Sequence, residues 1–144
     1  MVLLQVLKVV IMSEGGQPPK LMSDQDAGYD LISPASYVLK KGMRKKIPLG
    51  IAIQVPEGTY GRLCSRSSVV SEYGVSVEAG VIDRGYTGEV GILLNHRGTK
   101  TYEICKGHRI GQLILERCVQ ARVAVVESLP VTQRGAGGWG STGK

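Results

Sequence analysis

Aromatic residues are scarce in this chain of 144 residues, which contains six Tyr, one Trp and no Phe. So few aromatic side chains argue against a protein that stacks several bases of a nucleic acid. The formal net charge of +6 nevertheless favours an anionic partner, although charge alone does not distinguish a nucleic acid from a small polyphosphate. A chain of this length is expected to form one domain.

Cysteines are few, and their spacing excludes two common uses. Cys64, Cys105 and Cys118 are odd in number and form no C-x-x-C pair, so they support neither a disulfide framework nor a zinc site. We expect reduced, mostly buried thiols in an intracellular protein of the cytoplasm or nucleus, and a viral origin is compatible with this.

A long hydrophobic run is also lacking. The apolar stretch at residues 1–12 is too short to span a bilayer. It contains Lys8 and has neither a preceding basic region nor a small-residue cleavage site. We therefore interpret it as a first strand rather than as a signal sequence.

Apolar residues alternate with a period of two in three segments, 47–55, 89–95 and 118–126. This alternation predicts strands with one buried face. Turns rich in glycine and proline separate these segments, so we expect an all-β, jelly-roll-like β-barrel. Residues 67–73 could form a short helical turn, although their β-branched valines argue against it. The pattern ends at Leu129, which predicts a β-barrel domain over residues 1–129 and a flexible, glycine-rich C-terminal arm over residues 130–144.

Three segments break the alternation with polar residues and glycines. "SRSS" at 65–68 offers the Arg66 guanidinium and two hydroxyls to a phosphate, but a solvated turn is the commoner role of such a tetrapeptide. "DAGYDL" at 26–31 provides carboxylates at 26 and 30 that could lie near a triphosphate-bound Mg²⁺, and here too a turn is the commoner role. The third segment, "AGVIDRGYTGEVG" at 79–91, resembles a β-hairpin with Asp83 near its tip.

The carboxylate of Asp83 could activate a water molecule or could only stabilise an Asx-turn, and the local sequence supports both equally. Glycines in the same segment leave backbone groups open to a base edge and could distinguish uracil from cytosine. In "GHRIGQLIL" at 107–115, Gln112 is either a structural hydrogen-bond anchor or a ligand contact. His96 and His108 belong to no catalytic motif, and we expect both at the surface.

The end of the chain, "RGAGGWGSTG" at 134–143, has high backbone entropy, so a partner must compensate for ordering it. Trp139 could stack on a base, the Arg134 guanidinium could bind a phosphate, and Ser141 and Thr142 add hydroxyls. A disordered linker is the alternative.

In this order, the five segments resemble the five motifs of the trimeric deoxyuridine triphosphatases (dUTPases). "DAGYDL" resembles the first motif and "SRSS" the second. "AGVIDRGYTGEVG", "GHRIGQLIL" and "RGAGGWGSTG" resemble the remaining three. The resemblance covers residues 26–143. It implies a homotrimer with active sites between subunits and Mg²⁺-dependent hydrolysis of dUTP to dUMP and pyrophosphate, which limits uracil incorporation into DNA.

The resemblance also implies roles for individual residues. Asp83 resembles the base that activates the water attacking the α-phosphate, and Asp30 resembles the carboxylate that holds a metal-bound water. The metal itself is then held by the substrate phosphates, with no direct protein ligand. The implied phosphate contacts are Arg66, Ser67, Ser68 and Gln112.

The nucleoside and the arm have their own implied contacts. Residues of the third segment resemble those that bind uracil and the deoxyribose, namely Ala79, Gly80, Val81, Tyr86 and Gly91. In the arm, Arg134 resembles the γ-phosphate clamp and Trp139 the aromatic lid over uracil. Their implied phosphate-binding companions are Gly140, Ser141 and Thr142.

Four positions depart from the family pattern, and none removes a group assigned to the chemistry. Ser65 stands in place of a proline, which we expect to loosen its loop. Gly85 and His108 stand where acidic residues are usual, and Trp139 replaces Phe. Alternative functions are a dCTP deaminase-like or bifunctional enzyme of the same fold, a non-catalytic dUTPase-like binding module, and a basic nucleic-acid binder. Asp83, Tyr86 and the complete arm favour hydrolysis over deamination, and the presence of Asp83, Arg66, Gln112 and Arg134 argues against a non-catalytic module. We expect neither stable nucleic-acid binding nor membrane association.

Overall fold

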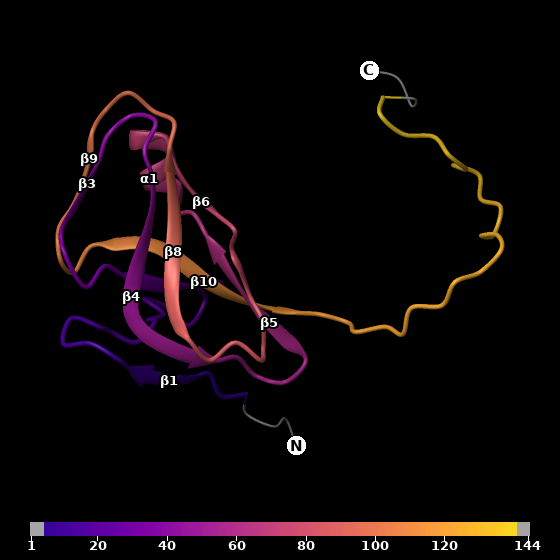
Figure 1. The fold of residues 1–144 in the computed structure, drawn as a ribbon, viewed down its shortest axis with the longest axis horizontal. Coiled ribbons are helices and arrows are strands. Elements are labelled where there is room, and N and C mark those ends of the chain that lie inside the picture. The colour runs from indigo at the N-terminus through magenta and orange to yellow at the C-terminus, as the bar shows by residue number, and fades with distance from the viewer. Residues whose placement is uncertain (1–4, 141–144) are drawn as a thin grey trace.

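The computed structural model describes residues 5–140, and nearly all its regular elements are strands (Figure 1). In chain order they are β1 (Lys8–Ile11), β2 (Tyr29–Ile32), β3 (Tyr37–Leu39), β4 (Arg44–Gln54), β5 (Thr59–Cys64), α1 (Ser67–Tyr73), β6 (Val75–Glu78), β7 (Val81–Ile82), β8 (Glu89–His96), β9 (Tyr102–Ile104) and β10 (Arg109–Arg117). Within this range, no helix has the length and apolar character needed to cross a membrane. The predicted all-β, jelly-roll-like fold is confirmed. Residues 67–73 do form a helix, α1, although their β-branched valines argued against it.

The strands form two antiparallel four-stranded sheets, β1-β4-β8-β6 and β2-β10-β5-β7, and a separate pair, β3-β9. Neighbouring strands are mostly distant in sequence, which is characteristic of a jelly roll. The strands predicted at 47–55 and 89–95 are confirmed as β4 and β8. Their alternating apolar side chains fill the core, with Ile47, Leu49 and Ile92 each at most 1% exposed.

Two expectations about burial are wrong. His96 is fully buried, because it continues the inward-facing positions Ile92 and Leu94 of β8. Its Nε2 lies 2.9 Å from the Lys100 carbonyl oxygen. The thiols of Cys105 and Cys118 are exposed rather than buried, since each follows the end of a strand.

The predicted hairpin around residue 83 is regular only at its base. There β6 pairs with β8, with Glu78 opposite Leu93. After Gly80, whose carbonyl accepts a hydrogen bond from the Leu63 N–H (2.7 Å), the chain joins β5 as β7 instead. The segments 79–83 and 89–91 therefore diverge into different sheets and leave a space between them.

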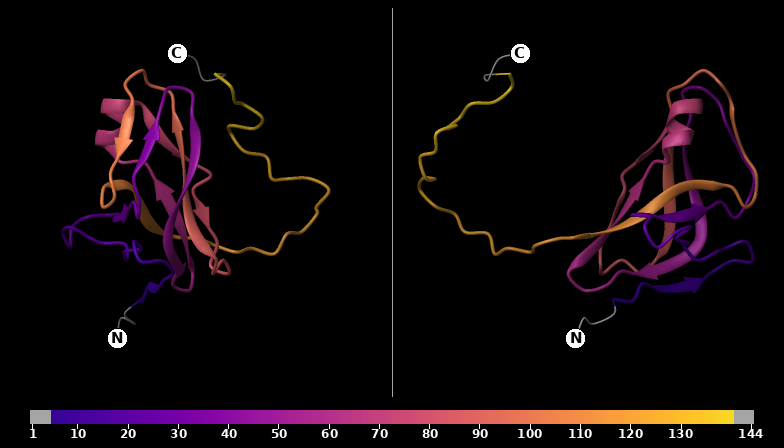
Figure 2. Two further views of the ribbon diagram at one scale, coloured as in Figure 1. Left: turned by 60° about the vertical axis from the view of Figure 1, so that its left-hand side comes forward. Right: turned by 180° about the vertical axis from the view of Figure 1, so that it is seen from behind.

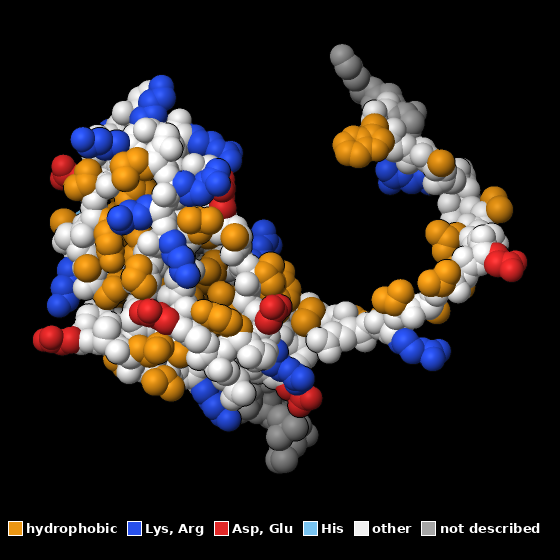
Figure 3. Space-filling view, viewed as in Figure 1, with side chains coloured by type: hydrophobic (Ala, Val, Ile, Leu, Met, Phe, Trp, Pro, Cys, Tyr) orange, Lys and Arg blue, Asp and Glu red, His pale blue; other side chains and the backbone are white. Residues whose placement is uncertain are grey.

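The prediction of a strand at 118–126 is wrong for the isolated chain. In the described residues after Arg117 there is no strand, and the chain extends away from the body (Figures 1 and 2). Val119, Val123 and Val125 are each more than 90% exposed, and Figure 3 shows apolar side chains along this segment free of the body. The alternation signals a strand, but no sheet edge of the same chain pairs with it. The division of the chain after Leu129 stays a prediction.

Candidate active site

The first group of predicted residues lies together in one pocket of about 290 Å³, which we call the Asp30 pocket. Asp30 comes from β2 and Gln112 from the neighbouring β10, and the two residues are direct partners in the sheet. The end of β5 and the start of α1 supply the remaining predicted members, Arg66, Ser67 and Ser68. The five residues assigned to phosphate and metal-water contacts are thus brought together.

Two guanidinium groups hold the Asp30 carboxylate. Arg109 Nη1 lies 3.1 Å from one of its oxygens, and Arg66 Nε lies 3.5 Å from the other. Arg66 also donates to the carbonyl of Arg109 (3.1 Å). The Asp30 side chain is only 15% exposed, so these contacts give a mostly buried carboxylate two charged hydrogen-bond partners.

Backbone contacts fix the loop that carries Arg66. Gln112 Nε2 donates to the carbonyl of Ser65 (3.0 Å), which makes this side chain a structural anchor as well as a pocket residue. Ser65 Oγ accepts a hydrogen bond from the Val77 N–H (2.8 Å). The serine that replaces the family's proline therefore ties its loop to β6, contrary to our expectation of a looser loop.

The second group lines a different pocket of about 320 Å³, the Asp83 pocket, in the space where residues 79–83 and 89–91 diverge. Its predicted members are Ala79, Val81, Asp83, Tyr86 and Gly91, together with Ile82, Leu93 and Lys46. Gly80 lies at its edge, with its carbonyl bound to β5.

Hydrogen bonds shape the tip of this pocket. The Tyr86 N–H donates to the Asp83 carbonyl (3.0 Å), and the Tyr86 hydroxyl donates to the carbonyl of Glu89 (2.7 Å). These two contacts close the tip as a turn and hold the tyrosine ring against Gly88. Asp83 is thereby placed next to a fixed aromatic ring.

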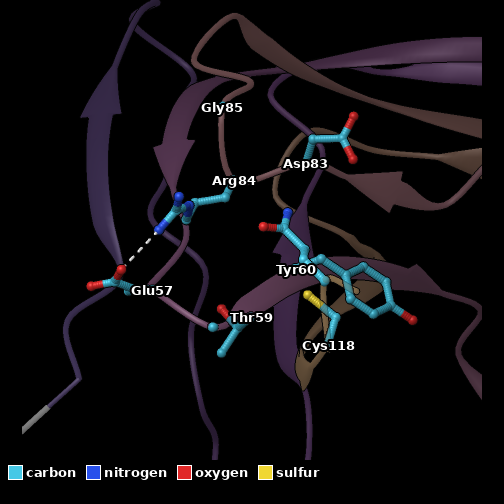
Figure 4. A pocket seen from close by; sticks show the side chains of 9 residues that line it. Glu57, Thr59, Tyr60, Asp83, Arg84, Gly85 and Cys118 are labelled. Atoms are coloured by element: carbon cyan, nitrogen blue, oxygen red, sulfur yellow. Dashed lines mark hydrogen bonds and ion pairs between the residues drawn. The ribbon is translucent and has the colours of Figure 1, made fainter. Parts of the chain in front are cut away.

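Asp83 also borders a hollow on the other side of the hairpin tip, of about 490 Å³ (Figure 4). Arg84, the next residue, turns toward Glu57 and pairs with it at 3.3 Å, whereas the Asp83 carboxylate points away from this pair. No cationic group of residues 5–140 lies within 4.0 Å of the Asp83 carboxylate. Within residues 5–140 its oxygens are therefore held by no ion pair.

Asp83 and Arg66 do not meet within one chain. Ile82 pairs with Gly61 in β5, which places Asp83 opposite Tyr60 near the start of that strand. Arg66 follows the other end of the same strand. At a strand rise of about 3.3 Å per residue, the six steps from Tyr60 to Arg66, the last two beyond the end of β5, span at most roughly 20 Å along the backbone.

The third group lies on the extended C-terminal segment, away from both pockets. Trp139 is fully exposed, and among residues 5–140 the Arg134 Nε donates to the nearby carbonyl of Gly137 (2.9 Å). Gly140 is the last residue described, and Ser141 and Thr142 lie outside the described residues. The predicted site residues therefore fall into three separate places in one chain.

Two charged residues that line the pockets, Arg109 and Lys46, were not predicted as site residues from the sequence. Arg109 lies in the quoted segment 107–115, three positions before Gln112, but its bond to Asp30 spans 79 positions of the chain. Lys46 lies outside all five segments, and only the register of β4 with β8 brings it to the Asp83 pocket. No local pattern could have identified Lys46.

Known proteins resemble this chain over almost its whole length. The dUTPase family model matches residues 16–143. The deoxyuridine 5'-triphosphate nucleotidohydrolase of Candida glabrata is 50% identical, over 96% of this chain and 97% of that protein. The enzyme of the same name from Paramecium bursaria Chlorella virus 1 is 46% identical, over 95% and 97% respectively.

Solved structures of dUTPases also resemble this chain. The dUTPase of Staphylococcus bacteriophage 80alpha with bound dUPNHPP is 30% identical and superposes with a TM-score of 0.89, over 96% of this chain and 99% of that one. A mutant dUTPase from phage phi11 of S. aureus, 29% identical with a TM-score of 0.79 over 85% and 97%, coordinates a structural Mg(II) ion.

Proposed function

This chain belongs to the dUTPase family, and from that premise we propose that it hydrolyses dUTP to dUMP and pyrophosphate at sites shared between copies of the chain. The observation that supports this most strongly is the division of the predicted residues between the Asp30 pocket, the Asp83 pocket and the arm. A general base must lie within about 3 Å of the proton that it removes. The Asp83 pocket and the Asp30 pocket share no lining residue, so one chain does not bring Asp83 and Arg66 to the same reacting group.

A homotrimer resolves this separation, because a symmetric assembly can place the Asp83 pocket of one copy opposite the Asp30 pocket of another. The exposed apolar residues of 118–126 support association as well. Their alternation is that of a strand, and pairing with a sheet edge of another copy would bury them. The arm that follows would then reach a site on a neighbouring copy.

The chain's own residues supply most of the mechanism. Asp83 orients a water molecule for attack on the α-phosphate and takes up its proton. Arg66 and the hydroxyls of Ser67 and Ser68 bind the phosphates. The ring of Tyr86 packs below the deoxyribose and leaves no space for a 2′-hydroxyl.

The arm closes the site. Trp139 covers the uracil and Arg134 binds the γ-phosphate, so closure requires both ends of the substrate and excludes bulk water. An intracellular location and a role in limiting uracil incorporation into DNA follow from this activity and stay predictions.

The Asp30 pocket also suits a metal held by the substrate. No group of three His, Cys, Asp or Glu side chains in residues 5–140 could chelate an ion. A carboxylate bound by two guanidiniums nevertheless keeps lone pairs for a water molecule. Mg²⁺, when bound through the triphosphate, neutralises charge on the leaving pyrophosphate.

The test is release of pyrophosphate and of ammonia from dUTP, UTP, dTTP and dCTP, with and without Mg²⁺. We expect pyrophosphate from dUTP alone, dependent on the metal, and a loss of about 10²-fold or more in Asp83→Asn. A chain truncated after Thr132 should keep its thermal unfolding midpoint and lose most turnover. Ammonia from dCTP, or unchanged turnover in Asp83→Asn, would overturn the proposal.

A further inference from the structure

Lys46 of β4 gives the Asp83 pocket a second charged side chain. Among the described residues that line this pocket, Lys46 and Asp83 alone carry charge. Asp83 has an assigned role as the base, whereas Lys46 belongs to none of the five motif segments. Lys46 is exposed to solvent at the pocket, so its ammonium is accessible to a ligand that enters there.

The stem of Lys46 lies over Gly91. Lys46 is the sheet partner of Leu93, two residues further along β8. A Cβ atom at position 91 would overlap with Lys46 Cε and would lie 3.2 and 3.4 Å from its Cγ and Cδ. The absence of a side chain at Gly91 therefore makes room for the lysine stem, which runs toward the opening between residues 79–83 and 89–91.

Lys46 differs from its basic neighbours in having no partner among residues 5–140. Arg44, on the same face of β4, pairs with Glu78 at 3.6 Å. The ammonium of Lys45, on the opposite face, lies 5.4 Å above the ring of Tyr37. No carboxylate of the described residues lies within 4.0 Å of Lys46 Nζ. Its three N–H donors are thus free to bind a ligand.

The two ends of the pocket indicate which part of the ligand Lys46 meets. Asp83 lies at the hairpin tip, where the proposed function puts the reacting phosphate. Lys46 and Leu93 lie at the opposite end, where β6 and β8 close on one another. The pyrimidine must enter this closed end if the α-phosphate is to reach Asp83.

On the basis of the proposed function, we propose that the Lys46 ammonium donates a hydrogen bond to a carbonyl oxygen of the uracil ring. Lys46 is then a substrate-binding residue of this chain that supplements the backbone contacts of residues 79–91. A charged donor next to a neutral carbonyl gives a stronger hydrogen bond than a backbone N–H would.

Lys46→Met tests the contact, because methionine retains most of the apolar stem and removes the ammonium. Lys41→Met is the matched control, since it removes the same charge from the exposed turn before β4 and lines none of the pockets described above. Two quantities are measured for each variant, the inhibition constant of deoxyuridine and the dissociation constant of α,β-imido-dUTP. We expect Lys46→Met to weaken both by the same factor of roughly tenfold, and Lys41→Met to leave both nearly unchanged.

Equal behaviour of the two variants toward both ligands would overturn the contact. A loss confined to α,β-imido-dUTP would move Lys46 to the phosphates and overturn its assignment to the base. Lys46→Arg, which keeps a cationic donor, should recover binding, and thermal unfolding midpoints show whether any variant is misfolded. Failure of the wild-type chain to bind α,β-imido-dUTP would instead refute the proposed function.

Discussion

At the scale of single residues, we expect the ion pair between Arg109 and Asp30 to determine how Arg66 divides its contacts between the Asp30 carboxylate and a bound phosphate. Arg66 contacts the Asp30 carboxylate from one side while Arg109 holds it from the other. If Arg109 is lost, Arg66 becomes the only cation at that carboxylate, and an incoming phosphate must compete with Asp30 for it. We therefore expect Arg109 to position both the Asp30 carboxylate and the Arg66 guanidinium.

We expect Arg109→Met to lower kcat/KM for dUTP by about tenfold to a hundredfold, since small misplacements of binding groups have effects of this size. Arg109→Lys should give an intermediate loss, because lysine keeps the charge without the planar fork. The measurement is kcat/KM together with the Mg²⁺ concentration for half-maximal rate. Arg97→Met, which breaks a similar exposed pair with Glu78 (2.8 Å), is the control, and equal effects of the two methionine variants would contradict the assignment.

A second residue-scale prediction concerns Glu116 at the end of β10. The Tyr60 hydroxyl donates to its carboxylate at 2.6 Å and Arg62 pairs with it at 2.9 Å. The hydrogen bond from Tyr60, and then that from Arg62, lower the pKa of Glu116. A lowered pKa in the folded state stabilises the fold above the unfolded-state pKa, and this stabilisation is lost as the pH falls through the folded-state value.

The difference in free energy of unfolding between wild type and Glu116→Gln should therefore be largest at neutral pH and shrink from about pH 5 to about pH 3. Urea denaturation at a series of pH values measures this difference. Glu57→Gln removes a carboxylate that is 92% exposed and pairs, within the described part of the chain, with Arg84 alone, so it should change stability little at any pH. A pH-independent difference for Glu116→Gln would show that its bonds do not favour the ionised form.

At the scale of elements, the alternation of apolar residues predicted β4 and β8 because each buries one face against the core of the same chain. The same alternation at 118–126 predicted a strand that the isolated chain does not form. The pattern reports which face of a strand is apolar, and it carries no information on which chain covers that face. His96 shows the reverse error, because the inward positions of β8 include it although its side chain is polar.

The residues of the candidate site also fall into those that the local sequence could identify and those that it could not. Asp30, Asp83 and Gln112 could be selected from local segments, since each stands among glycines or apolar residues that do not explain a polar group. Lys46 and Arg109 could not, because their places depend on strand register across distant parts of the chain. The separation of the two pockets along β5 likewise follows from the pairing of β7 with β5.

The hairpin between β6 and β8 diverges at Gly80, and this position gives a prediction about the stability of the hairpin. A Cβ at Gly80 would overlap with the carbonyl oxygen of Leu63, a backbone atom of β5 that cannot move alone. Gly80→Ala should therefore destabilise the fold by about 1–3 kcal/mol and raise KM for dUTP. Gly85→Ala lies in the same hairpin with nothing within 4 Å of the new methyl group.

Urea denaturation and steady-state kinetics of the two alanine variants measure these effects. Gly85→Ala should match the wild type in unfolding midpoint and change KM little. Equal stability of Gly80→Ala and Gly85→Ala would mean that β7 and β5 separate readily, and that the pocket is less firmly shaped than the bond between Leu63 and Gly80 indicates.

At the scale of the whole molecule, the body and the extended segment have opposite surfaces. The body buries most of its large aliphatic residues in one core, although Val10, Val38 and Val81 are more than half exposed, whereas residues 119–131 expose theirs in succession (Figure 3). An isolated chain with so much free apolar surface is expected to associate. Under the proposed function, association through this segment would also carry Arg134 and Trp139 to another copy, so assembly and completion of the site would depend on the same stretch of chain.

Shared sites can be tested by mixing two inactive variants, Asp83→Asn and Arg66→Met. If Asp83 and Arg66 of one site come from different copies, random mixed assemblies restore about one quarter of all sites, because each intact residue is supplied with a probability of one half. If both residues came from the same chain, every site would keep one defect and activity would stay at the level of the separate variants. The two variants are unfolded together, refolded at equal concentration and assayed for pyrophosphate release from dUTP. Mixing them without unfolding is the control, and recovery should appear only as fast as subunits exchange.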